Sequence, residues 1–542
     1  MPMAAAIKMQ GQLSAVNILI IIIPLVLGLG LYHLARAWFP LERRPKDISW
    51  IGREQGLLSS FRACLVQWRY NPNILEAGYK AFNKTGKAFL MPLISFEPIV
   101  ILPQEHIKWI IDQPPTVLCP RRAAYTRMGV RYVAPGFTPA TSEILHTAIK
   151  VHLNKKFDRL QGDMYDQMSW AIDRSFGTAN CVSKVSLGDA LRYAVYHTLV
   201  PVLAGRELAK NERFVEAIIS SSQWFGAAST VTGQCLPPPI RGVIGWVLQK
   251  PIRYIQRRYL VYLMPIVKER LRKLQEDSEV PQDMVTWLCQ AILKTRGPNG
   301  AEEVFADAFN LLLGAAFTST VLTAHHTLLD ILGSSEKDEI YRILRSEAES
   351  VFDGPAKWAN PATVHHLDYI DSTLRESLRR APPTSMALLR EVVPRDGLTL
   401  PNGQLLNKGS WLAVPSIPIH NDQRFYETAD HFKPFRFVRD GNSESCVSTS
   451  DTFLSFGHGR SACAGRQFAT RILKMMLSYV VLNYDIEAID GRPPNFFMGE
   501  HAVPPDVVKY ESTCICSYKE TSAFLLLTAT FATGFALVSE PQ

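Results

Sequence analysis

The chain has 542 residues and 47% of them are hydrophobic, so it can bury a large core. Its formal net charge of +8 is modest, and no basic stripe with interleaved aromatic residues appears, so no nucleic-acid partner is expected. The nine cysteines lack the paired spacing of zinc sites, and Cys514 and Cys516 are too close together for a usual zinc knuckle. The sequence contains no internal repeat and no low-complexity tract.

An uncharged apolar stretch near the start runs from Ala15 to Ala35, about 21 residues, which is the length of a membrane-spanning helix. Pro24 within the stretch is tolerated in such a helix. One lysine precedes the stretch and four basic residues follow it within residues 36–46, so the positive-inside rule places the bulk of the chain in the cytosol. We therefore expect a transmembrane anchor over residues 15–36. A cleaved signal peptide is the alternative, although the apolar region is long for one and no clear cleavage site follows it.

After a hinge from Pro40 to Pro45, apolar and β-branched residues predict a strand over Ser95–Leu102. Asn402-Gly403 is a strong turn signal within a predicted hairpin over Thr399–Val414. Most of the remaining sequence has the periodicity of helices. Helical segments are predicted over Glu143–Arg159, Asn211–Phe225, Ile252–Lys273, Val304–Leu332, Asp368–Arg379 and Gln467–Leu482. The expected fold class is mainly α with small β-sheets.

The helix predicted over Asp368–Arg379 places Glu376 and Arg379 three residues apart, on one face. Such a pair is common on solvated surfaces, where it contributes little, so alone it predicts nothing. A second motif, Phe-Lys-Pro-Phe-Arg-Phe at residues 432–437, lies about twenty residues before a glycine-rich loop at residues 455–467. The occurrence of the three segments together and in this order is stronger evidence for a common function than any one of them alone.

The loop at residues 455–467 reads Ser-Phe-Gly-His-Gly-Arg-Ser-Ala-Cys-Ala-Gly-Arg-Gln. Gly457, Gly459 and Gly465 let the backbone turn sharply and approach a flat ligand closely. A cysteine thiolate is a metal ligand, and the N–H groups of such a turn can donate hydrogen bonds to its sulfur. The alternative is that Cys463 is a small buried hydrophobe, as most free cysteines are.

This loop resembles the haem-ligand loop of the cytochrome P450 superfamily, Phe-Gly-x-Gly-x-x-x-Cys-x-Gly. The resemblance implies that Cys463 is the axial thiolate to haem iron and that Phe456 packs beside it. A thiolate pushes electron density onto iron, which favours O–O cleavage over oxygen storage. The resemblance extends from about Pro45 to Pro505 and is greatest to fungal secondary-metabolism oxidases of terpenoid and indole-diterpene pathways. It implies one catalytic domain over residues 45–506, with the cytochrome P450 fold.

By the same resemblance, Glu376, Arg379 and Arg436 form an internal salt-bridge triad with a structural role, although Phe435 replaces the acid that the family usually has there. Ser461 stands where the family usually has a cation for a haem propionate. Arg390 matches another propionate ligand of the family, and His146 with Lys150 more weakly matches a helix pair that also binds haem. These three residues are expected to compensate for Ser461.

The helix over Val304–Leu332 should cross the distal side of the haem, where the family often has an acid and an alcohol that relay protons. In the preferred alignment Thr318 stands at the acid and Ser319 at the alcohol, with Thr320 next to them. An alignment shifted by one residue puts Phe317 and Thr318 there instead. Neither alignment supplies a carboxylate, so protons must pass through hydroxyl groups and water. Alternatively, these hydroxyls only bond back to the preceding helical turn.

The resemblance also predicts the surroundings of the haem. Substrate is expected to contact apolar segments near Tyr125–Val133, Phe225, Phe309–Phe317, Ser385–Leu389 and Phe496–Met498. Basic residues on two helices are expected to border the proximal haem face, where they would steer an acidic reductase, although a solvated face is an equal alternative. These residues are Lys150, Lys155, Lys156, Arg159, Arg466, Arg471 and Lys474.

We expect a haem-thiolate monooxygenase that takes electrons from NADPH through NADPH-cytochrome P450 reductase and inserts one oxygen atom from O2 into a lipophilic substrate, a terpenoid or meroterpenoid. Desaturation, rearrangement or multi-step oxidation on the same fold is one alternative, and a haem-binding protein without turnover is another. In a eukaryotic member of the family the anchor implies the endoplasmic reticulum membrane, with residues 1–14 in the lumen. Residues 507–542 depart from the family. They are either a real C-terminal helix or the result of an incorrectly assigned intron or a frame-shifted end.

Overall fold

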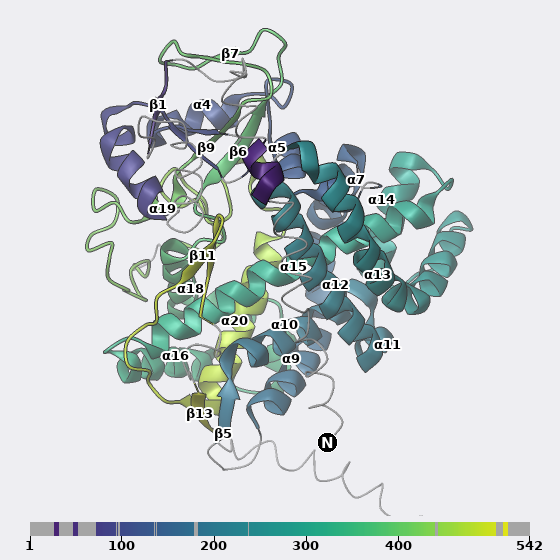
Figure 1. Cartoon of the computed structure of the whole chain (residues 1–542). Coiled ribbons are helices and arrows are strands. Elements are labelled where there is room, and N and C mark those ends of the chain that lie inside the picture. The colour runs from purple at the N-terminus through teal and green to yellow at the C-terminus, as the bar shows by residue number, and fades with distance from the viewer. Residues whose placement is uncertain are drawn as a thin grey trace, which may run out of the picture.

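The computed structural model describes residues 26–31, 47–51, 72–93, 95, 98–134, 136, 138–177, 183–236, 238–439, 443–505 and 513–518 (Figure 1). These residues form a mainly helical body with small β-sheets, which confirms the predicted fold class. Most of the expected anchor and of the tail after residue 506 lies outside the described residues, apart from a helical turn at 26–31 and the segment 513–518.

The largest sheet has six strands in the order β1-β2-β3-β9-β6-β4. Alternate residues of its middle strands enter two separate hydrophobic cores, as the period of two along a strand requires. Leu90, Val100 and Leu412 belong to one core, and Phe89 and Ile99 belong to the other. The strands are β1 (Ser49–Trp50), β2 (Phe89–Met91), β3 (Ile99–Ile101), β4 (Leu118–Cys119), β6 (Ala387–Val392) and β9 (Trp411–Val414).

The helices surround α15 (Ala301–Leu332), which packs against α7, α10, α12, α13, α14, α18 and α20 (Figure 1). In the described part of the chain, α15 is the one helix long and apolar enough to cross a membrane, but its neighbours make it a core helix. The principal helices are α4 (Ile107–Asp112), α5 (Pro120–Arg127), α6 (Val130–Val133), α7 (Pro139–Thr147), α9 (Gln161–Phe176), α10 (Leu187–Ala204), α12 (Glu212–Thr230), α13 (Pro238–Gln275), α14 (Met284–Arg296), α16 (Lys337–Val351), α18 (Asp368–Arg380), α19 (Ser416–His420) and α20 (Arg466–Asn483). Short helices complete the set: α8 (Asn154–Lys156), α11 (Arg206–Ala209), α17 (Pro355–Ala359), η1 (Asn83–Thr85), η2 (Gln104–His106), η4 (Phe157–Leu160) and η6 (Thr363–His366).

Two helical predictions differ from the structure at their N-terminal ends. The segment predicted from Glu143 begins at Pro139, because Thr138 caps α7 through its hydroxyl and a proline is well suited to the first helical position. It then continues through a π-helical turn, η3 (Ala148–Leu153), before its last short turns. Helix α13, predicted from Ile252, begins at Pro238 and runs through Pro251 and Pro265, each of which removes one backbone hydrogen bond without ending the helix.

The predicted hairpin is present but shorter than expected. Strand β7 (Leu398–Thr399) pairs antiparallel with β8 (Leu405–Leu406), and Gly403 between them has the positive φ of 84° that the turn requires. The residues beyond it form β9, which leaves the hairpin and joins the large sheet.

A second sheet brings the end of the chain back to the body. Strand β13 (Thr513–Tyr518) pairs antiparallel with β10 (Tyr484–Ile486) and with β5 (Ser183–Ser186). Strand β13 therefore adds residues beyond 506 to this sheet. A further hairpin, β11 (Phe496–Met498) with β12 (His501–Val503), lies near α18 and below β6 in Figure 1.

Candidate active site

The glycine-rich loop reaches Cys463 through two turns. Gly457 and Gly459 both have φ of 69°, a conformation that side-chain-bearing residues rarely adopt. A Cβ at Gly459 would also lie 3.0 Å from Cβ of Ile111, so this glycine allows the loop to pack against α4. The Cys463 N–H donates to the Phe456 carbonyl over 2.8 Å, which closes the loop just before α20 begins. Residues 459–461 form a 3-10 turn, η7 (Gly459–Ser461).

Cys463 is exposed, although protein atoms surround its sulfur on several sides. This partial burial raises the pKa of the thiol, while backbone N–H groups of Gly465 and Arg466 and the Arg466 charge act to lower it. A Cβ added at Gly465 would meet nothing within 4 Å, so the space beside the cysteine is open. An accessible thiol beside two N–H donors and open space fits the axial ligand of a flat metal cofactor.

Helix α18 fixes the start of this loop. The Ser455 hydroxyl donates to the Leu378 carbonyl over 2.8 Å, and the Leu454 N–H donates to Nε2 of His420 over the same distance. His420 is fully buried, and its Nδ1 lies 2.9 Å from the Arg379 carbonyl. The ring is thus neutral, with its proton on Nδ1, and burial lowers its pKa to about 3.

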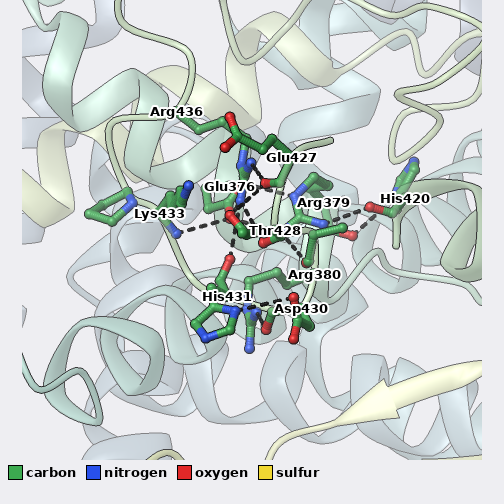
Figure 2. Close-up of polar contacts among 12 residues, drawn as sticks. Glu376, Arg379, Arg380, His420, Glu427, Thr428, Asp430, His431, Lys433 and Arg436 are labelled. Atoms are coloured by element: carbon green, nitrogen blue, oxygen red, sulfur yellow. Dashed lines mark hydrogen bonds and ion pairs between the residues drawn. The ribbon is translucent and has the colours of Figure 1, made fainter. Parts of the chain in front are cut away.

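Glu376, Arg379 and Arg436 lie in contact, as Figure 2 shows. Arg379 and Glu376 form a two-fold hydrogen-bonded pair at 2.8 Å, with both side chains fully buried. Nε of Arg436 donates to Glu376 over 2.9 Å, and the Lys433 N–H adds a third partner at 3.1 Å. Burial alone would raise the pKa of Glu376, but the two guanidinium groups lower it below its usual value.

The arginines of this group also hold the backbone of the segment before the loop. Arg379 donates to the carbonyls of His420 and Ala429, and Arg436 donates to the carbonyl of Glu427 at 2.5 Å (Figure 2). Arg375, one turn earlier on α18, donates to the carbonyls of Ser445 and Ser448 and covers the ring of Phe453 at 3.9 Å. The buried charges therefore hold residues 421–439 and 443–455, which have little regular secondary structure.

Arg390 on β6 is a buried cation, 5% exposed, that donates to the Leu389 carbonyl over 3.0 Å and forms no ion pair with a carboxylate in the described part of the chain. Burial lowers its pKa to about 10. A buried charge without a counter-charge is costly, so an anionic group of a ligand would stabilise it. This residue therefore fits a haem propionate.

The other expected propionate ligands are less constrained. His146 on α7 is half-buried, and burial together with Arg121 and Lys150 lowers its pKa. Lys150, in the π-helical turn that follows, is exposed. The same stretch touches the cysteine loop further on, where the Asn154 amide donates to the Ala464 carbonyl over 2.8 Å.

One face of α15 is accessible in the middle of a helix that is otherwise buried. Ala315 and Thr318 are exposed and Ser319 and Leu322 are partly exposed, with the spacing of a single helix face. Ser319 donates to the Ala315 carbonyl over 3.2 Å. Thr320 lies on another face, is 4% exposed and bonds to the Ala316 carbonyl at 2.7 Å. The structure therefore brings Thr318 and Ser319, but not Thr320, to the accessible face, which carries no carboxylate.

The expected substrate segments meet only in part. Val130, Val133 and Phe225 form one apolar cluster, which Leu311 and Tyr125 join. Phe309 and Phe317, in contrast, are fully buried in the main core, where Phe317 stacks on Tyr196 with ring centroids 4.0 Å apart. Both side chains enter the core in this structure, and their contact with substrate stays a prediction.

The expected cationic face is also smaller than predicted. Arg471 and Lys474 are each 8% exposed and form ion pairs, Arg471 with the half-exposed Asp158 and Lys474 with the buried Asp371 at 2.9 Å. Lys156 donates to Gln282 and is half-buried. Lys150, Lys155 and Arg159 are the exposed cations of this set, with Arg466 partly exposed.

Sequence reasoning missed several buried polar residues that support the site. These are His420, whose ring accepts from the loop, and Arg375, which lies in the helix predicted over Asp368–Arg379 and donates to the segment before the loop. It also missed a cluster in which Arg492 donates to Asp330 and, over 2.9 Å, to Nδ1 of His326. The partners come from distant parts of the chain, so no local sequence pattern predicts these contacts.

Comparison with known proteins agrees with this geometry. The sequence model of Cytochrome P450 matches residues 144–511. Cytochrome P450 monooxygenase polB from Polytolypa hystricis is 32% identical over 490 residues, which cover 86% of this chain and 93% of that protein. Cytochrome P450 monooxygenase nodZ from Hypoxylon pulicicidum is 31% identical, over 86% of this chain and 92% of its own length. Cytochrome P450 monooxygenase lnaC from Aspergillus flavus is 29% identical, over 87% and 93%. The chain therefore belongs to the cytochrome P450 family and is a monooxygenase of that family.

Proposed function

We propose that this chain inserts one oxygen atom from O2 into a lipophilic substrate, a terpenoid or meroterpenoid of fungal secondary metabolism, with Cys463 as the axial ligand of its haem. The observation that carries the proposal is the accessible Cys463 thiol, which a closed loop presents beside backbone N–H donors and open space. A haem held there supplies the oxygen-activating chemistry, which a thiolate ligand favours.

The residues around the cysteine have separate tasks. Arg390 would hold a propionate, because its buried charge donates to the Leu389 carbonyl but pairs with no carboxylate among the described residues, and His146 with Lys150 would add cationic groups. Phe456, partly buried against the main core, packs beside the sulfur, and Glu376 with its two arginines keeps the preceding segment in place.

Thr318 and Ser319 deliver protons from the accessible face of α15. Ser319 holds a hydroxyl proton in a hydrogen bond to the Ala315 carbonyl, and at 3.2 Å that bond is long enough to be exchanged for one to a neighbouring molecule. The apolar cluster of Val130, Val133 and Phe225 provides the dry wall that a hydrocarbon-like substrate requires. The described face carries no carboxylate, which favours desaturation, rearrangement or multi-step oxidation as a second outcome of the same chemistry.

The cellular setting is part of the proposal. Residues 15–36 anchor the chain in the endoplasmic reticulum membrane with residues 1–14 in the lumen, and the catalytic domain faces the cytosol. NADPH-cytochrome P450 reductase supplies the electrons. The exposed Lys150, Lys155 and Arg159 support an acidic partner on the side of the Asn154 contact with the loop.

The test is oxygen transfer by the full chain in lipid vesicles with the reductase and NADPH. A panel of terpenoids and meroterpenoids is incubated under ¹⁸O2, and the products are analysed by mass spectrometry. We expect one labelled oxygen atom in a product and NADPH consumption that the same compound stimulates. Cys463→Ala should abolish both. Haem-loaded, reducible protein that transfers no label to any member of the panel would contradict the proposed reaction and substrate class.

A further inference from the structure

One buried ion pair joins two segments that are far apart in the sequence. Arg127 is the last residue of α5, and Glu500 lies in the turn between β11 and β12. Nε and Nη2 of Arg127 both donate to Oε1 of Glu500, and the Nε bond measures 2.8 Å. The two side chains are 4% and 9% exposed. Water therefore screens this pair weakly, and each charge depends on the other.

The turn that carries Glu500 is also tied to the segment before β6. The Ser385 N–H donates to the Glu500 carbonyl over 2.7 Å. Nδ1 of His501 lies 2.9 Å from the Pro383 carbonyl. Three of the segments expected at the substrate, near residues 125–133, 385–389 and 496–498, thus become one connected wall, with the Arg127–Glu500 pair as the link to α5.

The end of α5 also packs against the C-terminal end of α12 and the π-helical turn that follows it. Gly129, with φ of 65°, follows α5, and a Cβ there would lie 2.6 Å from the Ser229 carbonyl and 2.7 Å from the Gly233 nitrogen. Backbone therefore packs directly on backbone between this turn and the π-helical turn η5 (Val231–Cys235). A change in the position of Glu500 therefore acts on the end of α5 through the Arg127 side chain, and from there on the end of α12 through backbone packing.

The energetics favour a positioning role over a stabilising one. A buried ion pair adds little net stability, because the desolvation of its charges offsets their attraction. Nη1 of Arg127 is buried and has no hydrogen-bond partner among the residues that the structure describes, which is a further cost. Such a pair does position the two segments that it joins, because a carboxylate accepts hydrogen bonds from a guanidinium in only a few relative orientations.

We propose that Arg127 and Glu500 form a positioning pair that fixes the distal wall and so sets how tightly the enzyme holds large lipophilic molecules above the haem. Small molecules that bind at the haem without touching the wall do not depend on the pair. The inference rests on the proposed function, because it takes Cys463 as the haem ligand.

The experiment compares a large and a small azole that bind haem iron, clotrimazole and imidazole, by spectral titration of the holoprotein. We expect Arg127→Met and Glu500→Gln to raise the dissociation constant of clotrimazole about tenfold or more and to leave that of imidazole unchanged. The reversed pair, Arg127→Glu with Glu500→Arg, should recover most of the loss. The control is Arg121→Met with Glu143→Gln, a pair that also begins on α5 but is 46% and 61% exposed at 3.3 Å, and it should change neither constant.

Two results would overturn the inference. One is an unchanged clotrimazole constant in both single variants. The other is an equal loss for both azoles with reduced haem content, which would make the pair a fold-stabilising contact only.

A second measurement keeps the inference separate from the proposed function. Hydrogen–deuterium exchange should rise in peptides 120–133 and 496–503 of Arg127→Met and Glu500→Gln, and not in the Arg121 and Glu143 control. If the wild type shows no thiolate-haem spectrum, the proposed function fails while the exchange data still decide whether the pair holds the wall. Unchanged exchange in both peptides would contradict the pair's role.

Discussion

The segment before the cysteine loop and the distal wall are held together in different ways. Around Glu376, a single buried carboxylate accepts from two arginines and one backbone N–H, and those arginines also bind carbonyls of the segment. The distal wall depends on an apolar cluster, a few hydrogen bonds to backbone carbonyls and one buried ion pair, in which Nη1 of Arg127 has no partner among the described residues. Charges that share several hydrogen bonds are held in one arrangement, whereas apolar contacts alone allow several. The comparison indicates that a polar network positions the support of the haem ligand, and that the apolar substrate wall depends on the single Arg127–Glu500 pair for its position.

The largest expected effect comes from breaking the rigid side. Glu376→Ala leaves two buried guanidinium groups without their carboxylate, which costs about 3–5 kcal/mol, a large part of the stability of a typical domain. We expect loss of haem incorporation rather than slower turnover, measured as haem per protein in purified samples. Glu339→Gln, which removes an exposed partner of Arg342, should keep full haem content. Normally loaded Glu376→Ala protein would show that the network does not support the loop.

The stability of the segment before the cysteine loop should also depend on pH through His420. Burial lowers the pKa of this ring to about 3, while the unfolded chain has the ordinary value near 6.5. Between these two values the unfolded state binds a proton that the folded state does not, so stability falls as pH falls, by about 1.4 kcal/mol per pH unit. At pH 5 the loss should reach about 2 kcal/mol from this ring.

The measurement for this prediction is urea unfolding of the holoprotein between pH 7 and pH 5. His326, whose pKa burial also lowers to about 3, adds a similar slope to both proteins. Because His420→Asn lacks the contribution of the His420 ring, the wild type should lose more unfolding free energy between pH 7 and pH 5 than this variant does. Equal pH dependence of the two proteins would mean that the His420 ring takes up protons in the folded state.

A smaller effect is expected on the accessible face of α15. Ser319→Ala should keep haem and substrate binding but lower the product formed per NADPH severalfold, with hydrogen peroxide as the balance, because protons arrive late. Thr318→Ala tests the shifted alignment, in which it would uncouple more strongly than Ser319→Ala. Thr320→Ala is the matched control, since Thr320 is buried on another face. Undiminished coupling in both Thr318→Ala and Ser319→Ala would leave water alone as the proton source.

The smallest effect concerns the reductase. Lys155→Glu should slow the first electron transfer a few-fold at low salt and less at high salt, because surface charges act mainly on the association rate. Stopped-flow reduction of the haem measures this directly. Lys268→Glu, an equally solvated change on α13, is the control. Equal rates for both variants would remove this surface as the docking face.

The sequence predicted best what depends on near neighbours. The helix with Glu376 and Arg379 begins where its periodicity indicated, and the glycines at 457 and 459 have the φ values that their loop required. Burial of charged residues was not predictable in this way. Arg471 looks like a surface cation in its own helix, but its side chain is buried and pairs with Asp158 from a distant segment. Arg127 and Glu500 are 373 residues apart, so only the tertiary fold reveals their contact.

The most direct test of the account is the spectrum of the ferrous carbon monoxide complex in the wild type and in Cys463→Ala. A thiolate ligand shifts the Soret band of this complex to the red, and the account predicts that band in the wild type. Cys463→Ser and Cys463→Ala should both lack it, and Cys446→Ala, which removes a fully buried cysteine from the core, should retain it. A red-shifted band that survives in Cys463→Ala would contradict the assignment of this residue as the haem ligand.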